Sequence, residues 1–218
     1  MTSAFPAPMA KRITQPAVLG DPDLAADELA EFTRHLAGAE NYLEFGAGGS
    51  TVLAARARLG ALVAVDSDPA WAAAVRRDAD VTAAIAAGRA SVLHADIGAV
   101  GRWGTPMDTS QAHKWPDYAA VAFAEWTRRG AFSDLVFVDG RFRVACCLAT
   151  LLAAQAAGAK PPVVLLHDFN AERAQYRDVL AFYGIERQVG ELVVLQARGD
   201  VRVAEVEARM AVAWAEVR

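Results

Sequence analysis

Cysteine is nearly absent from this chain. Its 218 residues include two cysteines, Cys146 and Cys147, and these are adjacent. Neighbouring cysteines rarely bond to one another, and a single pair does not make the disulfide framework of a small secreted protein. We therefore expect a reduced protein of the cytoplasm, in which both thiols are ordinary helix residues.

Long apolar runs and an excess of basic charge are also lacking. No apolar run approaches the roughly 18 residues that a membrane-spanning helix requires. The first residues show no charged segment followed by an apolar one, so we expect no signal peptide. The formal net charge is -4 with the signs interspersed, whereas a nucleic-acid-binding domain usually carries a basic patch. These absences argue against a membrane or a nucleic acid as partner.

The chain is instead rich in apolar residues, 54% of the total, which occur in short runs between helical patterns. The runs are rich in Val, Leu and Ile and alternate little with polar residues, which is typical of strands buried on both faces of a parallel sheet. These runs cover residues 42–45, 61–65, 90–94, 134–138, 163–166 and 192–195. The helical patterns cover residues 23–36, 50–59, 69–87, 117–129, 141–157 and 171–182.

Regular alternation of strands and helices predicts an α/β fold with a doubly wound, mostly parallel sheet. A short run at residues 186–189 is separated from the last strand by Gly190 and Glu191. This arrangement predicts a hairpin, and with it an antiparallel final strand in a seven-stranded sheet. We expect one domain over residues 22–218, preceded by an N-terminal arm, residues 1–21, that could mediate a homodimer together with the outer strand.

One long connection, residues 97–116, has no clear period. Irregular loops of this length in compact domains are usually functional or disordered. This one contains Trp103, His113 and Trp115, and disordered segments seldom hold many large aromatic side chains. Two interpretations remain open: a lid that folds over a site and excludes water, or simple packing against the sheet edge.

A glycine cluster follows the first expected strand, in the stretch LEFGAGGST. Ligands of open α/β sheets bind beyond the carboxyl ends of the strands, and Gly46 and Gly48 can adopt positive φ and expose the backbone to a ligand. The loop lacks the lysine of a phosphate-binding loop, and Thr51 replaces the third glycine of a dinucleotide fingerprint. Glu44 would repel a pyrophosphate but suits an ammonium group. The stretch therefore predicts a site for a different cofactor.

Acidic residues stand at the ends of five expected strands. They are Glu44, Asp66, Asp96, Asp139 and Asp168. A single acid at such a position is usually a helix cap, but five along one rim are harder to explain in that way. Asp66 lies about 20 residues beyond the first glycine, where an acid can bind ribose hydroxyls.

Together these stretches resemble the motifs of the class I S-adenosylmethionine-dependent methyltransferases. LEFGAGGST looks like their first motif, VAVDSDP like the second, HADI like the third and DLVFVDG like the fourth. The terminal hairpin matches their reversed seventh strand, and the resemblance covers roughly residues 25–198. FVDGRFR and HDFN look most like the small-molecule O-methyltransferase branch and methyltransferase-like bacterial proteins.

The resemblance implies which residues bind S-adenosylmethionine. Glu44, Gly46 and Gly48 would face the methionine part, Asp66 would hold the ribose, and Asp96 would lie near adenine. Asp139 would lie at the sulfonium end, beside the methyl acceptor. The other residues that we expect to line the cofactor are Phe45, Ala47, Ser50, Ser67 and Ile97.

The acceptor end allows a metal-dependent interpretation. In catechol-type O-methyltransferases, an Asp after the fourth strand and an Asp-Asn pair after the fifth hold a divalent cation. Asp139 and Asp168 match two of these ligands, but Phe169 stands at the third position and Asn170 is displaced by one residue. Oxygen ligands of this kind would suit Mg²⁺.

A metal-free interpretation makes His167 or Asp168 the general base, since the pKa of histidine suits that work. In the alternative interpretation both residues have only structural roles: His167 holds loops together, and Asp168 caps the next helix. Arg141 begins a helix, where a basic side chain opposes the helix dipole. It either binds an anionic substrate or pairs with Glu172 or Asp168.

We therefore expect a methyltransferase that transfers a methyl group from S-adenosylmethionine to an oxygen of a small molecule. The chain lacks an N-P-P-Y-like segment after the fourth strand, which argues against an amino group of adenine or glutamine as acceptor. Two alternatives remain: an NAD-dependent oxidoreductase, and a module that binds S-adenosylmethionine without catalysis.

Overall fold

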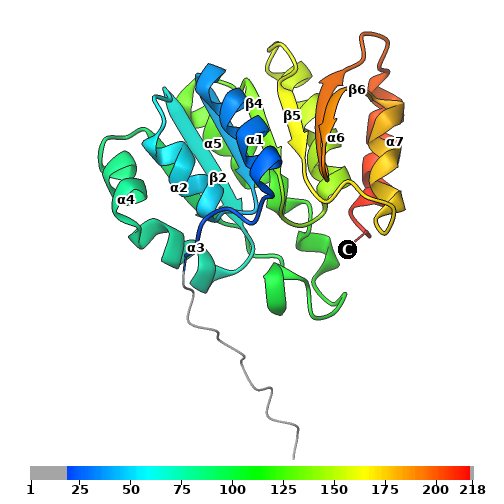
Figure 1. Ribbon diagram of the computed structural model, residues 1–218. Coiled ribbons are helices and arrows are strands. Elements are labelled where there is room, and N and C mark those ends of the chain that lie inside the picture. Colours follow the sequence, from blue (N-terminus) through cyan, green and yellow to red (C-terminus); the bar gives the residue numbers. More distant parts are fainter. Residues whose placement is uncertain (1–18, 217–218) are drawn as a thin grey trace, which may run out of the picture.

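The computed structural model describes residues 19–216. Its centre is a seven-stranded sheet with the order β3-β2-β1-β4-β5-β7-β6 (Figure 1). The strands are β1 (Asn41–Phe45), β2 (Ala61–Asp66), β3 (Ala90–His94), β4 (Leu135–Val138), β5 (Val163–Leu166), β6 (Tyr183–Val189) and β7 (Leu192–Ala197). The first five strands are parallel, whereas β7 runs antiparallel to both β5 and β6. The predicted seven-stranded sheet with a reversed hairpin strand is confirmed.

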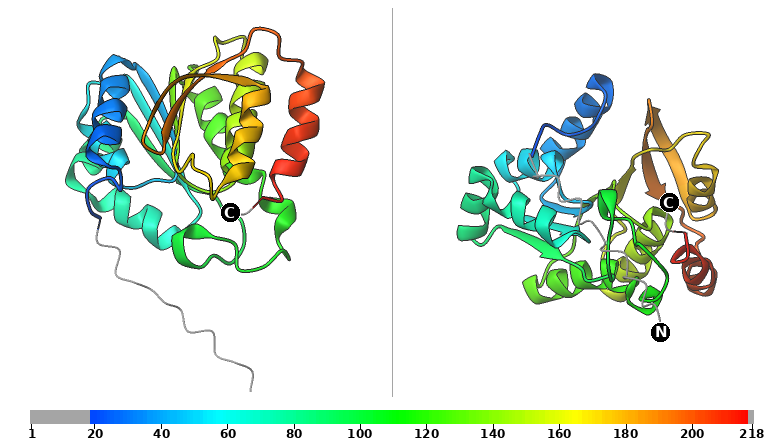
Figure 2. Two further views of the ribbon diagram at one scale, coloured as in Figure 1. Left: turned by 45° about the vertical axis from the view of Figure 1, so that its right-hand side comes forward. Right: turned by 90° about the horizontal axis from the view of Figure 1, so that it is seen from below.

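Helices cover both faces of the sheet, because both faces of its central strands are apolar (Figure 2). One face packs against α1 (Ala26–Gly38), α2 (Gly49–Arg56), α3 (Pro69–Arg77) and α4 (Ala79–Ala86). The other packs against α5 (Asp117–Arg129), α6 (Arg143–Ala156), the 3₁₀ segment η3 (Ala174–Ala181) and α7 (Val203–Ala213). In the described part of the chain, no helix combines the length and the apolar character that crossing a membrane requires.

Two of the expected helices were wrong in part, and one helix was not expected. Residues 69–87 form two helices, because Asp78 accepts hydrogen bonds from the Asp80 and Val81 amides and so caps a new helix start. Within the expected helix over residues 171–182, Ala174–Ala181 form a 3₁₀ segment rather than an α-helix. The helix α7, which packs on α6, was not expected.

The irregular segment 97–116 contains two short 3₁₀ turns, η1 (Arg102–Gly104) and η2 (Ala112–Lys114). It lies beneath the carboxyl ends of the strands in Figure 1. Trp115 is buried in the core, whereas Trp103 is 68% exposed. The segment is therefore folded against the predicted site. Most of the expected N-terminal arm, residues 1–18, lies outside the described residues.

Candidate active site at the carboxyl edge of the sheet

The glycine loop after β1 lies in backbone contact with the loop after β4. Gly46 has a φ of 100°, and a Cβ atom there would lie 2.6 Å from the Gly140 nitrogen. Only glycine fits this close approach. Gly48 differs from the expectation, since its φ of -178° is ordinary extended backbone. It caps α2, and its amide donates to Thr51 Oγ1 at 2.9 Å.

Glu44 is fully buried at the end of β1. Its carboxylate accepts hydrogen bonds from the Ser50 hydroxyl and, at 2.8 Å, from the Thr51 hydroxyl. Burial nevertheless raises the pKa of Glu44 to about 8. The hydroxyls of Ser50 and Thr51 therefore both donate to the carboxylate of Glu44, and Ser50 does not cap α2. Glu44 joins β1 to α2 and has no cationic partner among the ion pairs of residues 19–216.

Asp66 ends β2, and its Oδ1 accepts the Asp68 amide at 2.8 Å. Burial raises the pKa of Asp66 to about 7, although the charge of Arg141 opposes this shift. The neighbouring Ser67 hydroxyl donates to the Gly104 carbonyl at 3.0 Å. The segment 97–116 therefore touches the loop that is expected to hold the ribose.

The remaining residues predicted to bind the cofactor have varied surroundings. Asp96 is exposed and forms an ion pair with Lys114 at 2.8 Å, and this hydrogen bond lowers the pKa of Asp96. The side chains of Phe45, Ala47 and Ile97 are buried in the core. These three residues can therefore offer a ligand little more than their backbone.

The part of the site where the methyl acceptor is expected to bind is built around His167, which follows β5. Its Nδ1 lies 3.1 Å from Asp139 Oδ1, and its Nε2 lies 3.3 Å from Glu28 Oε2. Burial opposes a charge on the ring, but the hydrogen bond to Asp139 and the charges of Asp139 and Asp168 raise the pKa of His167. Both ring nitrogens are thus engaged by carboxylates, and the ring bridges α1 and the ends of β4 and β5. This is the arrangement expected if His167 pins loops together.

A second buried group, Arg143, holds the two aspartates. Its guanidinium lies 3.1 Å from Asp139 Oδ1 and 2.8 Å from Asp168 Oδ2, and it donates to the His167 carbonyl at 2.7 Å. Burial of Asp139 favours its neutral form, yet the charge of Arg143 and the bond to His167 hold the pKa of Asp139 below its ordinary value. Asp139 therefore remains a carboxylate.

Sequence reasoning missed Glu28 and Arg143 as parts of this site. Glu28, Glu31, Phe32 and Leu36 are the buried residues of α1, and their spacing of three and four places them on one face. An acid on the apolar face of a helix was the signal for Glu28. The helix α6 begins at Arg143 and not, as expected, at Arg141, so Arg143 is the basic residue of the first helical turn.

The three residues expected to bind Mg²⁺ are not brought together as a ligand set. Ligand atoms of Asp139, His167 and Asp168 lie within 4.8 Å of one another. However, the guanidinium of Arg143 already forms ion pairs with both aspartates. Asn170 donates to Glu191 at 2.8 Å, while its oxygen accepts the Glu172 and Arg173 amides. A guanidinium in the position that a cation would need does not fit Mg²⁺.

Arg141 points toward the segment 97–116. It donates to the Thr105 hydroxyl at 3.2 Å, and its buried Nε has no hydrogen-bond partner within residues 19–216. The expected ion pairs of Arg141 are not formed, because Asp168 pairs with Arg143 and Arg173. Burial and the nearby charge of Arg143 lower the pKa of Arg141.

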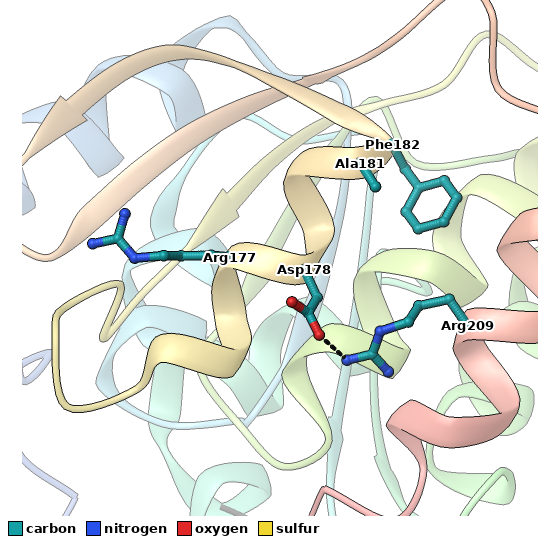
Figure 3. A pocket seen from close by; sticks show the side chains of 5 residues that line it. All are labelled: Arg177, Asp178, Ala181, Phe182 and Arg209. Carbon is teal, nitrogen blue, oxygen red and sulfur yellow. Dashed lines mark hydrogen bonds and ion pairs between the residues drawn. The ribbon is translucent and has the colours of Figure 1, made fainter.

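A surface cavity of about 410 Å³ lies elsewhere, between η3 and α7 (Figure 3). Its lining residues are Arg177, Asp178, Ala181, Phe182 and Arg209. Arg209 already forms ion pairs with Asp178 and Glu216. None of the predicted site residues lines this cavity, and we assign no ligand to it.

Comparison with solved structures identifies similar folds. A methyltransferase-like protein from Silicibacter pomeroyi DSS-3 is 29% identical, with a TM-score of 0.73, over 89% of this chain and 96% of that chain. A proposed O-methyltransferase from Klebsiella pneumoniae is 18% identical, with a TM-score of 0.50, over 83% of this chain and 84% of that chain. No protein-family model matches the chain, and a search of curated proteins found no match either. The resemblance to the class I methyltransferase superfamily is confirmed.

Proposed function

We propose that this protein is an S-adenosylmethionine-dependent methyltransferase that acts on an oxygen of a small molecule. One observation carries the proposal. Glu44, which is fully buried, and Asp66, which is partly buried, lie at the ends of the neighbouring strands β1 and β2 beside the close Gly46–Gly140 contact, and the pKa values of both carboxyls are raised, to about 8 and about 7. Buried acids without a salt-bridge partner are costly for the fold alone, and perturbed pKa values mark functional sites.

The residues present suit this cofactor. Asp66 would accept hydrogen bonds from ribose hydroxyls, and the Gly46 backbone would approach the methionine part. Asp139, which is kept ionised by Arg143 and His167, would face the positively charged sulfonium group of the cofactor. Bound S-adenosylmethionine would supply an activated methyl group. The chain would contribute alignment for in-line transfer, and the segment 97–116 would exclude water.

A second function is favoured by one observation. Among the described residues, the two candidate bases, His167 and Asp168, are both engaged in ion pairs. A module that binds S-adenosylmethionine without catalysis would have no use for a free base. Such a module would bind the cofactor yet transfer no methyl group to any acceptor.

Calorimetric titration with S-adenosylhomocysteine tests the cofactor, with NAD⁺ run in parallel. We expect S-adenosylhomocysteine to bind with micromolar affinity and NAD⁺ not to bind. Asp66→Asn should weaken binding at least about tenfold, because it removes a charged acceptor for the ribose. Asp68→Asn is the matched control: it lies in the same loop, where Asp68 caps α3, and asparagine caps equally well. Undiminished binding by Asp66→Asn would contradict the proposed role of Asp66.

A further inference from the structure

The part of the site around His167, where the methyl acceptor is expected to bind, has no free general base among residues 19–216, and this limits the chemistry of the acceptor. Transfer to an un-ionised hydroxyl benefits from a base that removes the proton. Within residues 19–216, His167 has both nitrogens bonded to Asp139 and Glu28, and Asp168 is held by Arg143 and Arg173. His113, in the segment 97–116, is exposed. The site is therefore better suited to an acceptor that is already ionised.

Arg141 adds a positive charge to the same edge of the sheet and forms no ion pair with the residues that the structure describes. The neighbouring residue Phe142 has a φ of 54° and is buried against Trp115, Tyr118 and Trp214. This backbone conformation, unusual for a non-glycine residue, separates two arginines. Arg143 turns inward to the aspartates, whereas Arg141 turns to Thr105 in the segment 97–116.

An arginine side chain remains charged in proteins, and a buried charge requires a partner. The Nε atom of Arg141 is buried and unbonded among the described residues. Asp66 and Asp139 lie close enough for their charges to interact with Arg141, but both are assigned to the cofactor in the proposed function. A planar guanidinium matches a carboxylate in geometry, since it can donate two parallel hydrogen bonds.

We propose, on the basis of the proposed function, that the acceptor is a small carboxylic acid whose carboxylate is bound by Arg141. Both carboxylate oxygens accept hydrogen bonds from Arg141, and one of them attacks the methyl carbon with its remaining lone pair. A carbon–oxygen bond forms as the sulfur–carbon bond breaks, and its electron pair goes to sulfur. The products are a methyl ester and a neutral thioether, S-adenosylhomocysteine. No proton is released, so no base is needed.

The test has two stages, which separates this inference from the proposed function. Saturation with S-adenosylhomocysteine comes first, and failure there contradicts the cofactor assignment. The saturated protein is then titrated with benzoate, phenylacetate and hexanoate, and with the neutral analogues benzyl alcohol and benzamide. We expect at least one carboxylate to bind, the neutral analogues not to bind, and Arg141→Gln to weaken carboxylate binding at least about tenfold when this variant is likewise saturated with S-adenosylhomocysteine.

Arg102→Gln is the matched control, because Arg102 is an exposed arginine of the segment 97–116, which Arg141 contacts, and it stacks on Trp103. It should bind carboxylates like the wild type. A methyl-labelled cofactor should also yield base-labile esters with the carboxylate that binds. The inference is overturned if neutral analogues bind as well as carboxylates, if Arg141→Gln binds them normally, or if none of the carboxylates binds to the saturated protein.

Discussion

At the scale of single residues, Glu44 and Asp66 link the candidate site to stability. Their pKa values, about 8 and about 7, exceed the ordinary values of 4.5 and 3.8. The folded protein thus holds these protons more tightly than the unfolded chain does. The resulting stabilisation is present below the ordinary values and is lost as the pH rises through the folded values.

We predict that Asp66→Asn changes the pH dependence of unfolding in the unliganded protein. The wild type should lose stability relative to the variant between about pH 4 and about pH 8, by up to about 4 kcal/mol, since each pKa unit corresponds to about 1.4 kcal/mol. Urea denaturation across this range measures the difference. Parallel curves for the two proteins would show that the carboxyl of Asp66 titrates normally.

Gly46 gives a second prediction. Gly46→Ala should destabilise the protein by about 2 kcal/mol or more, because the new Cβ would meet the Gly140 backbone in a positive-φ conformation. Gly48→Ala is the control, since a Cβ there meets nothing within 4 Å and φ is extended. The stability of both variants is measured by thermal unfolding, and their cofactor site is checked by titration with S-adenosylhomocysteine. Equal stability of the two variants would contradict the close contact.

At the scale of elements, Glu28 connects α1 to the site and to the β6–β7 turn. Its carboxylate accepts the Glu191 amide at 2.6 Å and the Ala25 amide at 2.9 Å, in addition to its contact with His167. Backbone hydrogen bonds oppose the effect of burial and lower the pKa of Glu28. A single side chain therefore fixes three segments.

We predict that Glu28→Gln costs about 2–3 kcal/mol of unfolding free energy, because an amide cannot accept all of these hydrogen bonds and His167 loses a countercharge. Glu31→Gln is the control: Glu31 is also buried on α1, but it pairs with Arg34 and His35. It should cost less and leave the Glu191 amide protected. Hydrogen exchange at Glu191 distinguishes the variants, and unchanged protection in Glu28→Gln would refute the connection.

At the scale of the whole molecule, the C-terminal helix supports the site from outside. Trp214, directly after α7, packs edge-on against Phe142 with ring centroids 5.5 Å apart. Phe142 lies between Arg141 and Arg143 and has a positive φ. Packing from α7 therefore helps to hold the backbone that directs both arginines.

Trp214→Ala should accordingly lower the unfolding free energy by about 2 kcal/mol, less than for a fully buried tryptophan because Trp214 is only partly buried. Val212→Ala is the control, since Val212 is 61% exposed and should have little effect. Urea denaturation compares the two variants. A change no larger than that of Val212→Ala would show that α7 does not stabilise this region.

Much of the fold could be predicted from the sequence, since apolar runs buried on both faces indicate parallel strands. The observed strands agree with the predicted runs to within a few residues. The position of the acids was also readable, because the residue that follows a parallel strand must lie at its carboxyl edge. Local sequence patterns gave wrong helix bounds where a single side chain starts a new helix, as when Asp78 divides the expected helix over residues 69–87 in two.

The sequence by itself determined the type of fold and the edge at which chemistry is expected. Only the tertiary structure decided which atoms meet there. Glu28 and His167 are 139 residues apart, and no local pattern reveals their contact. Likewise, Arg141 and Arg143 look equivalent in the sequence, but the conformation of Phe142 directs Arg143 to the aspartates and Arg141 to Thr105, with no ion pair for Arg141 within residues 19–216. Periodicity identifies a face or an edge, whereas partners depend on the packing of elements that are distant in the chain.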